Sequence, residues 1–185
     1  MEEVNSFKIF EKLKSVYRYA TVDNRHESVA EHTWAAIVLA DQLLEATDPT
    51  LNRLKVFELQ LYHDAVEIVT NDLPLHPDFD RSDKDGIEIK GSLELASKLA
   101  PKVSAKYLAL FNEYLEGKTR EAKFARCIDL LEADIHDLDY RIDWKDWTKE
   151  FHLASKLSYF EDFPYLKRIF LELVEYLDRE GYYKK

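Results

Sequence analysis

Histidines and carboxylates occur where a helical core would normally hold apolar side chains. His63 and Asp64 are consecutive in an apolar stretch, and a buried carboxylate is costly unless it is paired or binds a cation. His32 belongs to a separate predicted helix, and Asp129 lies within the mostly apolar segment 124–131. We therefore predict that these four side chains, from three helices, hold a metal ion.

The predicted ligands are two imidazole nitrogens and two carboxylates. Such a set suits Mn²⁺, Fe²⁺, Co²⁺, Ni²⁺ or Zn²⁺ better than Mg²⁺ or Ca²⁺, so one divalent transition metal ion is the expected cofactor. The set leaves room for a water molecule, whose pKa the ion would lower until the water is a nucleophile near neutral pH. A water used in this way needs a base beside it.

Two acidic residues follow the His–Asp pair and could serve as that base. Glu67 is four residues after His63 and three after Asp64, which places the three on one face of a helix with roughly 5 to 6 Å between Cβ atoms. Asp72 stands at the predicted helix end, where a second carboxylate could accept or relay a proton. Glu67 is the preferred candidate for activating water.

Simpler interpretations compete with the metal site. A lone core histidine such as His32 is more often a hydrogen-bonded structural residue, and only its combination with the other motifs favours ligation. Asp129 is preferred because its neighbours are apolar, but three other aspartates of the same segment are alternatives: Asp134, Asp137 and Asp139. Without a metal site, all four would be solvated helix charges.

The remaining histidines are expected at the surface or in loops, and only one of them is expected to border the site. They are His26, His76, His136 and His152, of which His76 is the bordering one. Because no additional well-placed histidines occur between Asp64 and Asp129, one metal ion is expected rather than two.

Amphipathic helices are predicted to position these residues. One helix is expected over residues 5–19, followed by a polar loop over 21–27. A second begins at Ser28, which forms a capping box with Glu31, and runs to about residue 46. A third begins at 48–49 and ends between 70 and 74, before a surface loop over 74–85 that borders the site; further helices are expected at 86–100, 103–116, 120–142 and 164–179.

Composition agrees with one all-α domain. The chain has 185 residues, of which 46% are hydrophobic and 34% charged, with only 4 Gly and 5 Pro. With 36 acidic and 26 basic residues its formal charge is -10, which would repel a nucleic acid polymer. A membrane span and a secretory leader are not expected, because no stretch approaches about 18 apolar residues and the first ten residues lack a basic start.

A single cysteine, Cys127, lies in an apolar helical pattern and cannot form an intramolecular disulfide. It is expected to be a small core residue, in a protein of the reducing cytoplasm. Aromatic residues are frequent in the last third of the chain, at Trp144, Trp147, Phe151 and 159–163. Core packing or a dimer surface explains them better than a base-stacking platform, and a homodimer is expected.

Two long motifs carry a resemblance to a known family. RHESVAEHTW at 25–34 and LYHDAVEIVTNDLP at 61–74 resemble the HD-domain 5'-deoxynucleotidases, and EAKFARCIDLL at 121–131 resembles the third motif of that family. The resemblance implies a single HD domain over residues 1–185, a helical bundle with a metal site between core helices. It implies the metal ligands His32, His63, Asp64 and Asp129, and the catalytic acidic pair Glu67 and Asp72.

The same resemblance suggests residues that contact substrate. Arg18 resembles the phosphate-binding arginine of the family's first helix, although Arg25 is a rival for that contact. Tyr19 could lie against the sugar and exclude a 2'-hydroxyl, whereas an aromatic at a helix end is usually packed. Asn71 departs from the glycine usual in relatives, but asparagine also tolerates a left-handed backbone.

These observations predict hydrolysis of deoxyribonucleoside 5'-monophosphates by a metal-dependent phosphohydrolase. Two alternatives stay open. One keeps the fold and metal but changes the substrate to another phosphate ester, such as a nucleoside triphosphate or a cyclic nucleotide. The other is a non-catalytic helical protein in which the metal is structural or has been lost.

Overall fold

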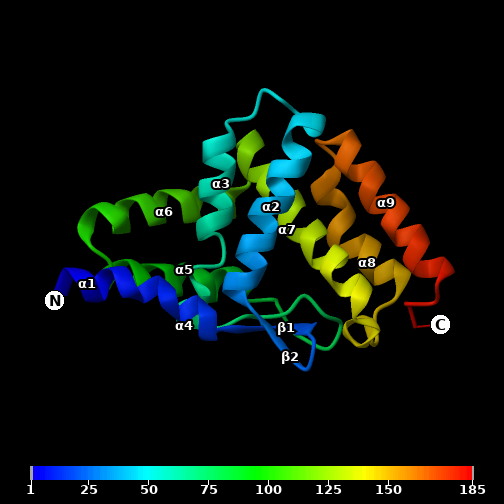
Figure 1. The fold of residues 1–185 in the computed structure, drawn as a ribbon, viewed down its shortest axis with the longest axis horizontal. Coiled ribbons are helices and arrows are strands. Elements are labelled where there is room, and N and C mark those ends of the chain that lie inside the picture. Colours follow the sequence, from blue (N-terminus) through cyan, green and yellow to red (C-terminus); the bar gives the residue numbers. More distant parts are fainter. Residues whose placement is uncertain (1, 185) are drawn as a thin grey trace.

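Helices make up most of the computed structural model, which describes residues 2–184 (Figure 1). The α-helices are α1 (Glu2–Phe7), α2 (Val29–Thr47), α3 (Arg53–Tyr62), α4 (Glu67–Thr70), α5 (Lys84–Ser97), α6 (Pro101–Glu116), α7 (Arg120–His136), α8 (Lys149–Lys156) and α9 (Pro164–Arg179). Short 3-10 helices are η1 (Lys8–Ser15), η2 (Asp137–Asp139), η3 (Arg141–Trp144) and η4 (Leu157–Phe160), and a single hairpin pairs β1 (Tyr17–Val22) with β2 (Arg25–Ser28). The prediction of an all-α fold is confirmed.

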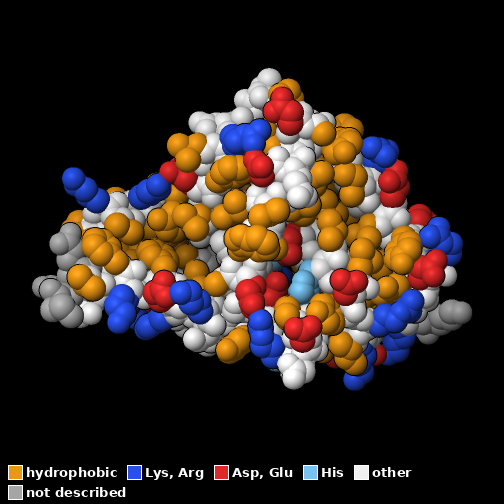
Figure 2. All heavy atoms as spheres, viewed as in Figure 1, with side chains coloured by type: hydrophobic (Ala, Val, Ile, Leu, Met, Phe, Trp, Pro, Cys, Tyr) orange, Lys and Arg blue, Asp and Glu red, His pale blue; other side chains and the backbone are white. Residues whose placement is uncertain are grey.

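Helix α2 begins where the sequence predicts. Ser28 Oγ accepts a hydrogen bond from the Glu31 backbone N–H, and Glu31 Oε2 accepts one from the Ser28 backbone N–H at 2.9 Å, so the predicted capping box is present. One face of α2 buries Ala36 and Ala40. The outer face leaves Trp34 70% exposed. Figure 2 shows hydrophobic side chains spread over the viewed face of the molecule, among charged groups.

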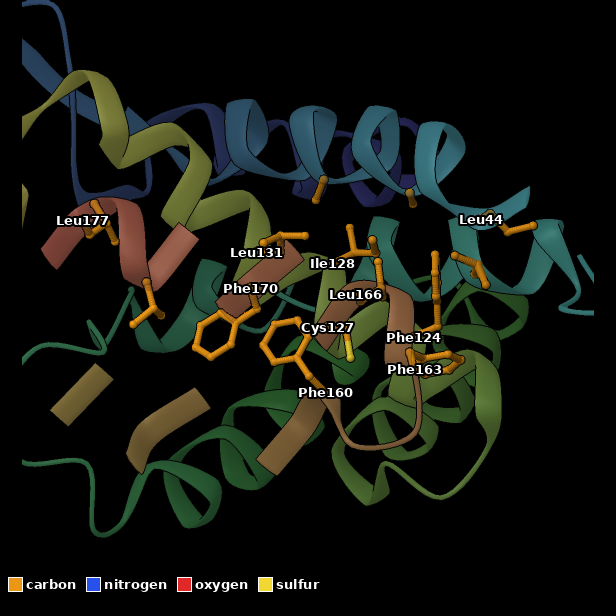
Figure 3. Close-up of a cluster of buried hydrophobic side chains, with 14 of the residues drawn as sticks. Leu44, Phe124, Cys127, Ile128, Leu131, Phe160, Phe163, Leu166, Phe170 and Leu177 are labelled. Atoms are coloured by element: carbon orange, nitrogen blue, oxygen red, sulfur yellow. The ribbon is translucent and has the colours of Figure 1, made fainter. Parts of the chain in front are cut away.

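The main apolar core lies between α2, α7, η4 and α9 (Figure 3). The rings of Phe160 and Phe170 stack with centroids 4.6 Å apart, and Cys127 is buried beside them, as predicted. Trp144 and Trp147 pack into the same core, which confirms the core interpretation for this part of the aromatic-rich segment. A second apolar cluster joins α4, α5 and α6. Helices α2, α3 and α7 contact one another between this cluster and the main core.

The first predicted helix is wrong beyond residue 15. Residues 17–28 form an antiparallel hairpin in place of a helix end and a polar loop, with Tyr17 opposite Ser28 and Val22 opposite Arg25. Tyr17, Tyr19 and Thr21 stand at alternate positions of β1, and aromatic and β-branched residues favour extended backbone over helix. Asp23, with φ 53°, makes the turn, since aspartate tolerates the left-handed region better than most residues.

The third predicted helix is interrupted at the His–Asp pair. Helix α3 ends at Tyr62, a series of turns covers 63–66, and α4 resumes at Glu67. Within the turns, the Glu67 N–H donates to the Asp64 carbonyl three residues earlier instead of to a partner four residues earlier. His63 Nδ1 donates to the Gln60 carbonyl at 2.7 Å. In an uninterrupted α-helix this carbonyl would accept the backbone N–H of Asp64.

Other element boundaries also differ from the prediction. Helix α5 begins at Lys84, earlier than expected, and α7 ends at His136, where short 3-10 turns follow instead of six more helical residues. Helix α8 is not among the predicted elements. Among residues 2–184, no helix is both long and apolar enough to span a bilayer.

Helix α8 carries a buried ionic group against α7. Lys156 Nζ donates to Asp134 Oδ1 at 2.6 Å, and His152 Nε2 lies 2.9 Å from Asp134 Oδ2. His152 is fully buried, so its expected place at the surface is wrong. The residues next to His152 give no sign of its burial, because its hydrogen-bond partners are Asp134 on α7 and Tyr183 near the end of the chain.

The Asp134–Lys156 pair predicts an acid-sensitive contribution to stability. Burial alone would raise the pKa of Asp134, but Lys156 and His152 outweigh it and lower that pKa. Replacing Asp134 by Asn leaves a buried ammonium without its counter-charge, so the free energy of unfolding should fall by about 3 to 5 kcal/mol at pH 7. The native pKa is depressed, so this contribution is complete above about pH 4 and is lost as the pH falls through the native value.

Urea unfolding of wild type and Asp134→Asn between pH 3 and pH 7 measures this contribution. The difference between the two proteins should shrink toward pH 3. Asp139→Asn, an exposed change on the following turn, is the matched control and should resemble wild type throughout. A difference that is as large at pH 3 as at pH 7 would show that the Asp134 charge does not stabilise the fold.

Candidate metal and phosphate site

Four of the predicted site residues converge where α2, α3 and α7 meet. One ligand atom from each of His32, His63, Asp64 and Asp129 lies within 4.8 Å of the other three. His32 Nε2 is 3.1 Å from Asp129 Oδ1, and His63 Nε2 is 3.0 Å from Asp64 Oδ2. The two Nε2 atoms are 3.4 Å apart.

These separations fit one bound divalent ion. Ligand atoms about 2.1 Å from a metal at tetrahedral or octahedral angles lie roughly 3.0 to 3.4 Å from one another. The donor set of two imidazoles and two carboxylates suits a transition metal. The four residues therefore form a cluster that fits a divalent metal site.

Both imidazoles are oriented from outside the cluster. His32 Nδ1 bonds Glu132 Oε2 at 2.5 Å, and His63 Nδ1 donates to the backbone carbonyl of Gln60 at 2.7 Å. Each Nδ1 is thereby engaged, which leaves each Nε2 lone pair to face the cluster when the imidazoles are neutral. Glu132 is a site residue that the sequence reasoning missed, although it follows Asp129 by three residues on one helical face.

Asp129 is held by two residues that were also missed. Tyr114 Oη donates to Asp129 Oδ2 at 2.7 Å, which leaves Oδ1 toward the imidazoles. The Arg126 guanidinium lies over the Tyr114 ring, 4.0 Å from its centroid, and 3.7 Å from Asp129 Oδ2. Of the alternatives to Asp129, Asp134 is engaged by Lys156 and does not belong to this cluster.

Charges within the cluster shift the pKa values of its imidazoles. Burial and the Arg18 charge lower the pKa of His32, but carboxylates led by Glu132 outweigh them and raise it to about 9. For His63, burial lowers the pKa, whereas Asp64 leads the groups that raise it to about 10. A metal ion would therefore compete with protons for the two Nε2 atoms.

Glu67 and Asp72 line a pocket that opens beside the cluster. Glu67 is buried, and its Oε2 has no hydrogen-bond partner among the described residues. Burial, and then the charges of Asp64 and Asp72, raise the pKa of Glu67 well above its ordinary value. Burial likewise raises the pKa of Asp72, whose Oδ2 accepts the Tyr19 backbone N–H at 3.3 Å. Both carboxyls therefore hold a proton more readily than an exposed carboxyl does.

Arg18 and Tyr19 reach the same pocket from strand β1 rather than from a helix. The Arg18 Nε lies 3.7 Å from Glu27 Oε2, and its Nη1 is buried without a hydrogen-bond partner in the described chain. A second group of closely spaced polar side chains consists of Glu27, Glu132 and His136. The positive charge of Arg18 already acts on the two glutamates of this group. The free Nη1 is a donor suited to an anionic ligand.

Arg25 is not brought to this pocket. Its guanidinium forms a two-pronged ion pair with Glu31 at 2.6 and 2.8 Å on the exposed side of β2. His26 is exposed and lies outside the pocket as well. His76 lies in a loop and lines the pocket, as expected. Its side chain is buried, and its Nε2 donates to the Lys145 carbonyl at 2.7 Å.

Comparisons with known proteins agree with this geometry. The chain is 26% identical over 137 residues to a 5'-deoxynucleotidase of Schizosaccharomyces pombe, covering 71% of this chain and 68% of that protein. It is 25% identical over 142 residues to a 5'-deoxynucleotidase of Dictyostelium discoideum, covering 72% and 75%. The crystal structure of a predicted metal-dependent phosphohydrolase from Magnetospirillum magnetotacticum superposes with a TM-score of 0.87 at 28% identity, over 100% of this chain and 95% of that one.

The family model described as HD domain matches residues 10–161, which is most of the chain and includes all the residues of the metal cluster. Together with the clustered histidines and aspartates, this match shows that the chain belongs to the HD domain family.

Proposed function

We propose that this protein is a metal-dependent phosphohydrolase that removes the phosphate from deoxyribonucleoside 5'-monophosphates. The convergence of His32, His63, Asp64 and Asp129 on one ion-sized space is the observation that carries the proposal. The 5'-deoxynucleotidase relatives support the choice of substrate. One HD domain over the whole chain is part of the same proposal.

One divalent ion would be held by His32, His63, Asp64 and Asp129, and when bound it would lower the pKa of water and polarise a phosphate oxygen. The side chain of Arg18 would hold the substrate phosphate through its free Nη1. This contact supplies positive charge locally in a protein whose overall charge is -10.

Glu67 and Asp72 would divide the proton transfers. Glu67 would accept a proton from the attacking water as the new oxygen–phosphorus bond forms. Asp72 would deliver a proton to the 5'-oxygen of the sugar as the bond from that oxygen to phosphorus breaks. The raised pKa values of both groups support roles in proton transfer.

Tyr19 would contact the sugar. Its backbone N–H is held by Asp72, and its ring packs against His76 with centroids 4.9 Å apart, so the ring is fixed at the pocket wall. A fixed ring at this wall is the basis for proposing that a 2'-hydroxyl is disfavoured. The role proposed for Arg25 in phosphate binding has no support from its position in the structure.

We also propose that the protein forms a homodimer and is located in the cytoplasm. The exposed indole of Trp34 adjoins an apolar groove lined by Phe10, Leu13, Ile37 and Leu61, which a second copy could cover. The molecular mass in solution tests the dimer. The buried, unpaired thiol of Cys127 is consistent with a reducing compartment.

The proposed reaction is tested by a substrate panel. The purified protein, loaded in turn with Mn²⁺, Co²⁺ or Zn²⁺, is assayed for phosphate release from deoxyribonucleoside and ribonucleoside 5'-monophosphates, a nucleoside triphosphate and a cyclic nucleotide. Release from the deoxyribonucleoside monophosphates in preference to the others supports the proposal. Release from none of them with any metal would contradict it.

Removing one ligand should abolish metal retention. In His63→Ala and Asp64→Ala, metal affinity should fall by more than the roughly 10- to 100-fold that changes outside the ligand set produce. Elemental analysis after gel filtration measures the loss. His26→Ala, an exposed change, is the control and should retain wild-type metal content. Full metal content in either ligand variant would show that the cluster does not bind the ion as proposed.

Arg18→Ala should weaken substrate binding without removing metal. Loss of a charged hydrogen bond to phosphate should raise KM roughly 10- to 100-fold, while metal content stays at the wild-type level. Arg25→Ala is the matched control, because its guanidinium is paired with Glu31 at the surface. Steady-state kinetics of the two variants decides which arginine contacts the phosphate. An active Arg18→Ala together with an inactive Arg25→Ala would assign the contact to Arg25.

Glu67→Gln should retain metal and substrate but lose turnover. The amide keeps the size of the side chain and cannot act as a base, so kcat should fall by roughly 10² to 10⁴. Glu58→Gln on the surface of α3 controls for the loss of a carboxylate elsewhere. If Glu67→Gln kept near-normal turnover with full metal occupancy, another group would activate the water, and Asp72 would be examined next.

A further inference from the structure

The pocket extends from the metal cluster along helix α7, and its far end is polar. Asp129, Ala133 and Asp137 follow one another at four-residue intervals and all line the pocket. Eight residues of helix span roughly 12 Å, so Asp137 stands well beyond a phosphate bound at the cluster. A sugar and the group attached to it would extend in this direction.

Asp137 presents an unexplained polar atom at that end. Its Oδ1 is buried and has no hydrogen-bond partner within residues 2–184. The backbone carbonyl of Asp137 is engaged, since it accepts the Trp144 indole N–H at 2.9 Å, but the side chain has no structural partner of this kind. A buried carboxyl oxygen without a partner costs free energy, so a ligand that satisfies it is the simplest reason to keep it.

Lys156 provides a donor in the same pocket. Its Nζ donates to Asp134 Oδ1 at 2.6 Å and to the Leu130 carbonyl at 3.2 Å. An ammonium group has three N–H bonds, which leaves one for the pocket that Lys156 lines. Trp147 and Leu130 also line the pocket, so it offers apolar and aromatic surface as well as polar atoms, as a planar ring would require.

We propose that Asp137 and Lys156 bind the hydrogen-bonding edge of the nucleobase of the substrate. This inference rests on the proposed function and adds the part of the substrate that the far end of the pocket recognises. Every nucleobase carries neighbouring donors and acceptors on its pairing edge. The Asp137 carboxylate would accept from a donor on that edge, and the Lys156 ammonium would donate to an acceptor.

The comparison of a nucleotide with its base-free counterpart tests this inference. The substrates are deoxyadenosine 5'-monophosphate and 2-deoxyribose 5-phosphate, and the proteins are wild type, Asp137→Ala and the control Asp139→Ala, an exposed change two residues away. In Asp137→Ala, kcat/KM for the nucleotide should fall roughly 10- to 100-fold, mainly through KM. The value for 2-deoxyribose 5-phosphate should not change.

Thermal unfolding separates this role from a structural one. Because Asp137→Ala removes a buried oxygen that has no partner, its Tm should equal or exceed that of wild type. Asp137→Asn, which keeps one acceptor oxygen, should show a smaller loss with the nucleotide. An equal loss with both substrates, or no loss with either, would overturn the inference.

The two proposals fail in different ways. If wild type hydrolyses neither substrate, the proposed function fails, and the same comparison is then made by calorimetric binding of deoxyadenosine 5'-monophosphate to the metal-loaded proteins. Equal affinity of wild type and Asp137→Ala overturns base recognition in that case. Weaker binding by Asp137→Ala alone supports it.

Discussion

The placement of the partly buried Asp64 and Asp129 between three helices is the constraint on which the rest of the structure depends. Two carboxylates this close together in a protein interior require compensating positive charge. His32 and His63 provide it when protonated, and a divalent ion would provide it when they are neutral. Protons and metal compete for the same two Nε2 atoms, so metal affinity and pH are linked by the geometry itself.

Bringing the two imidazoles beside these carboxylates determines the local backbone structure around the cluster. The helix that carries His63 breaks there, because the imidazole bonds the Gln60 carbonyl and tight turns replace regular helix. The chain then leaves α4 through Asn71, whose φ of 59° and ψ of 167° lie in a region that glycine normally occupies. Strain of this kind costs about 1 to 3 kcal/mol and recurs at functional sites. Here it immediately precedes Asp72.

The sequence could predict the cluster because each of its members is improbable as an ordinary core residue. His63 and Asp64 interrupt an apolar stretch, and the residues beside Asp129 are apolar. Contacts that depend on distant partners left no local signal: the burial of His152 against α7 is decided by Asp134 and Tyr183. The hairpin, by contrast, has a local signal: Tyr17, Tyr19 and Thr21 stand at alternate positions, which is typical of a strand. The helical spacing of the residues before them does not continue into this segment.

Charge in the pocket couples phosphate binding to metal binding. Seven acidic and five basic side chains line it, so the protein alone offers an anion a pocket with more negative than positive groups. A divalent ion at the cluster would bring the two signs to balance, and Arg18 Nη1 would then face phosphate without net repulsion. Because linkage is reciprocal, a bound phosphate must in turn tighten the hold on the ion. The acidic character of the pocket would therefore make phosphate binding depend on a metal ion held by the same carboxylates.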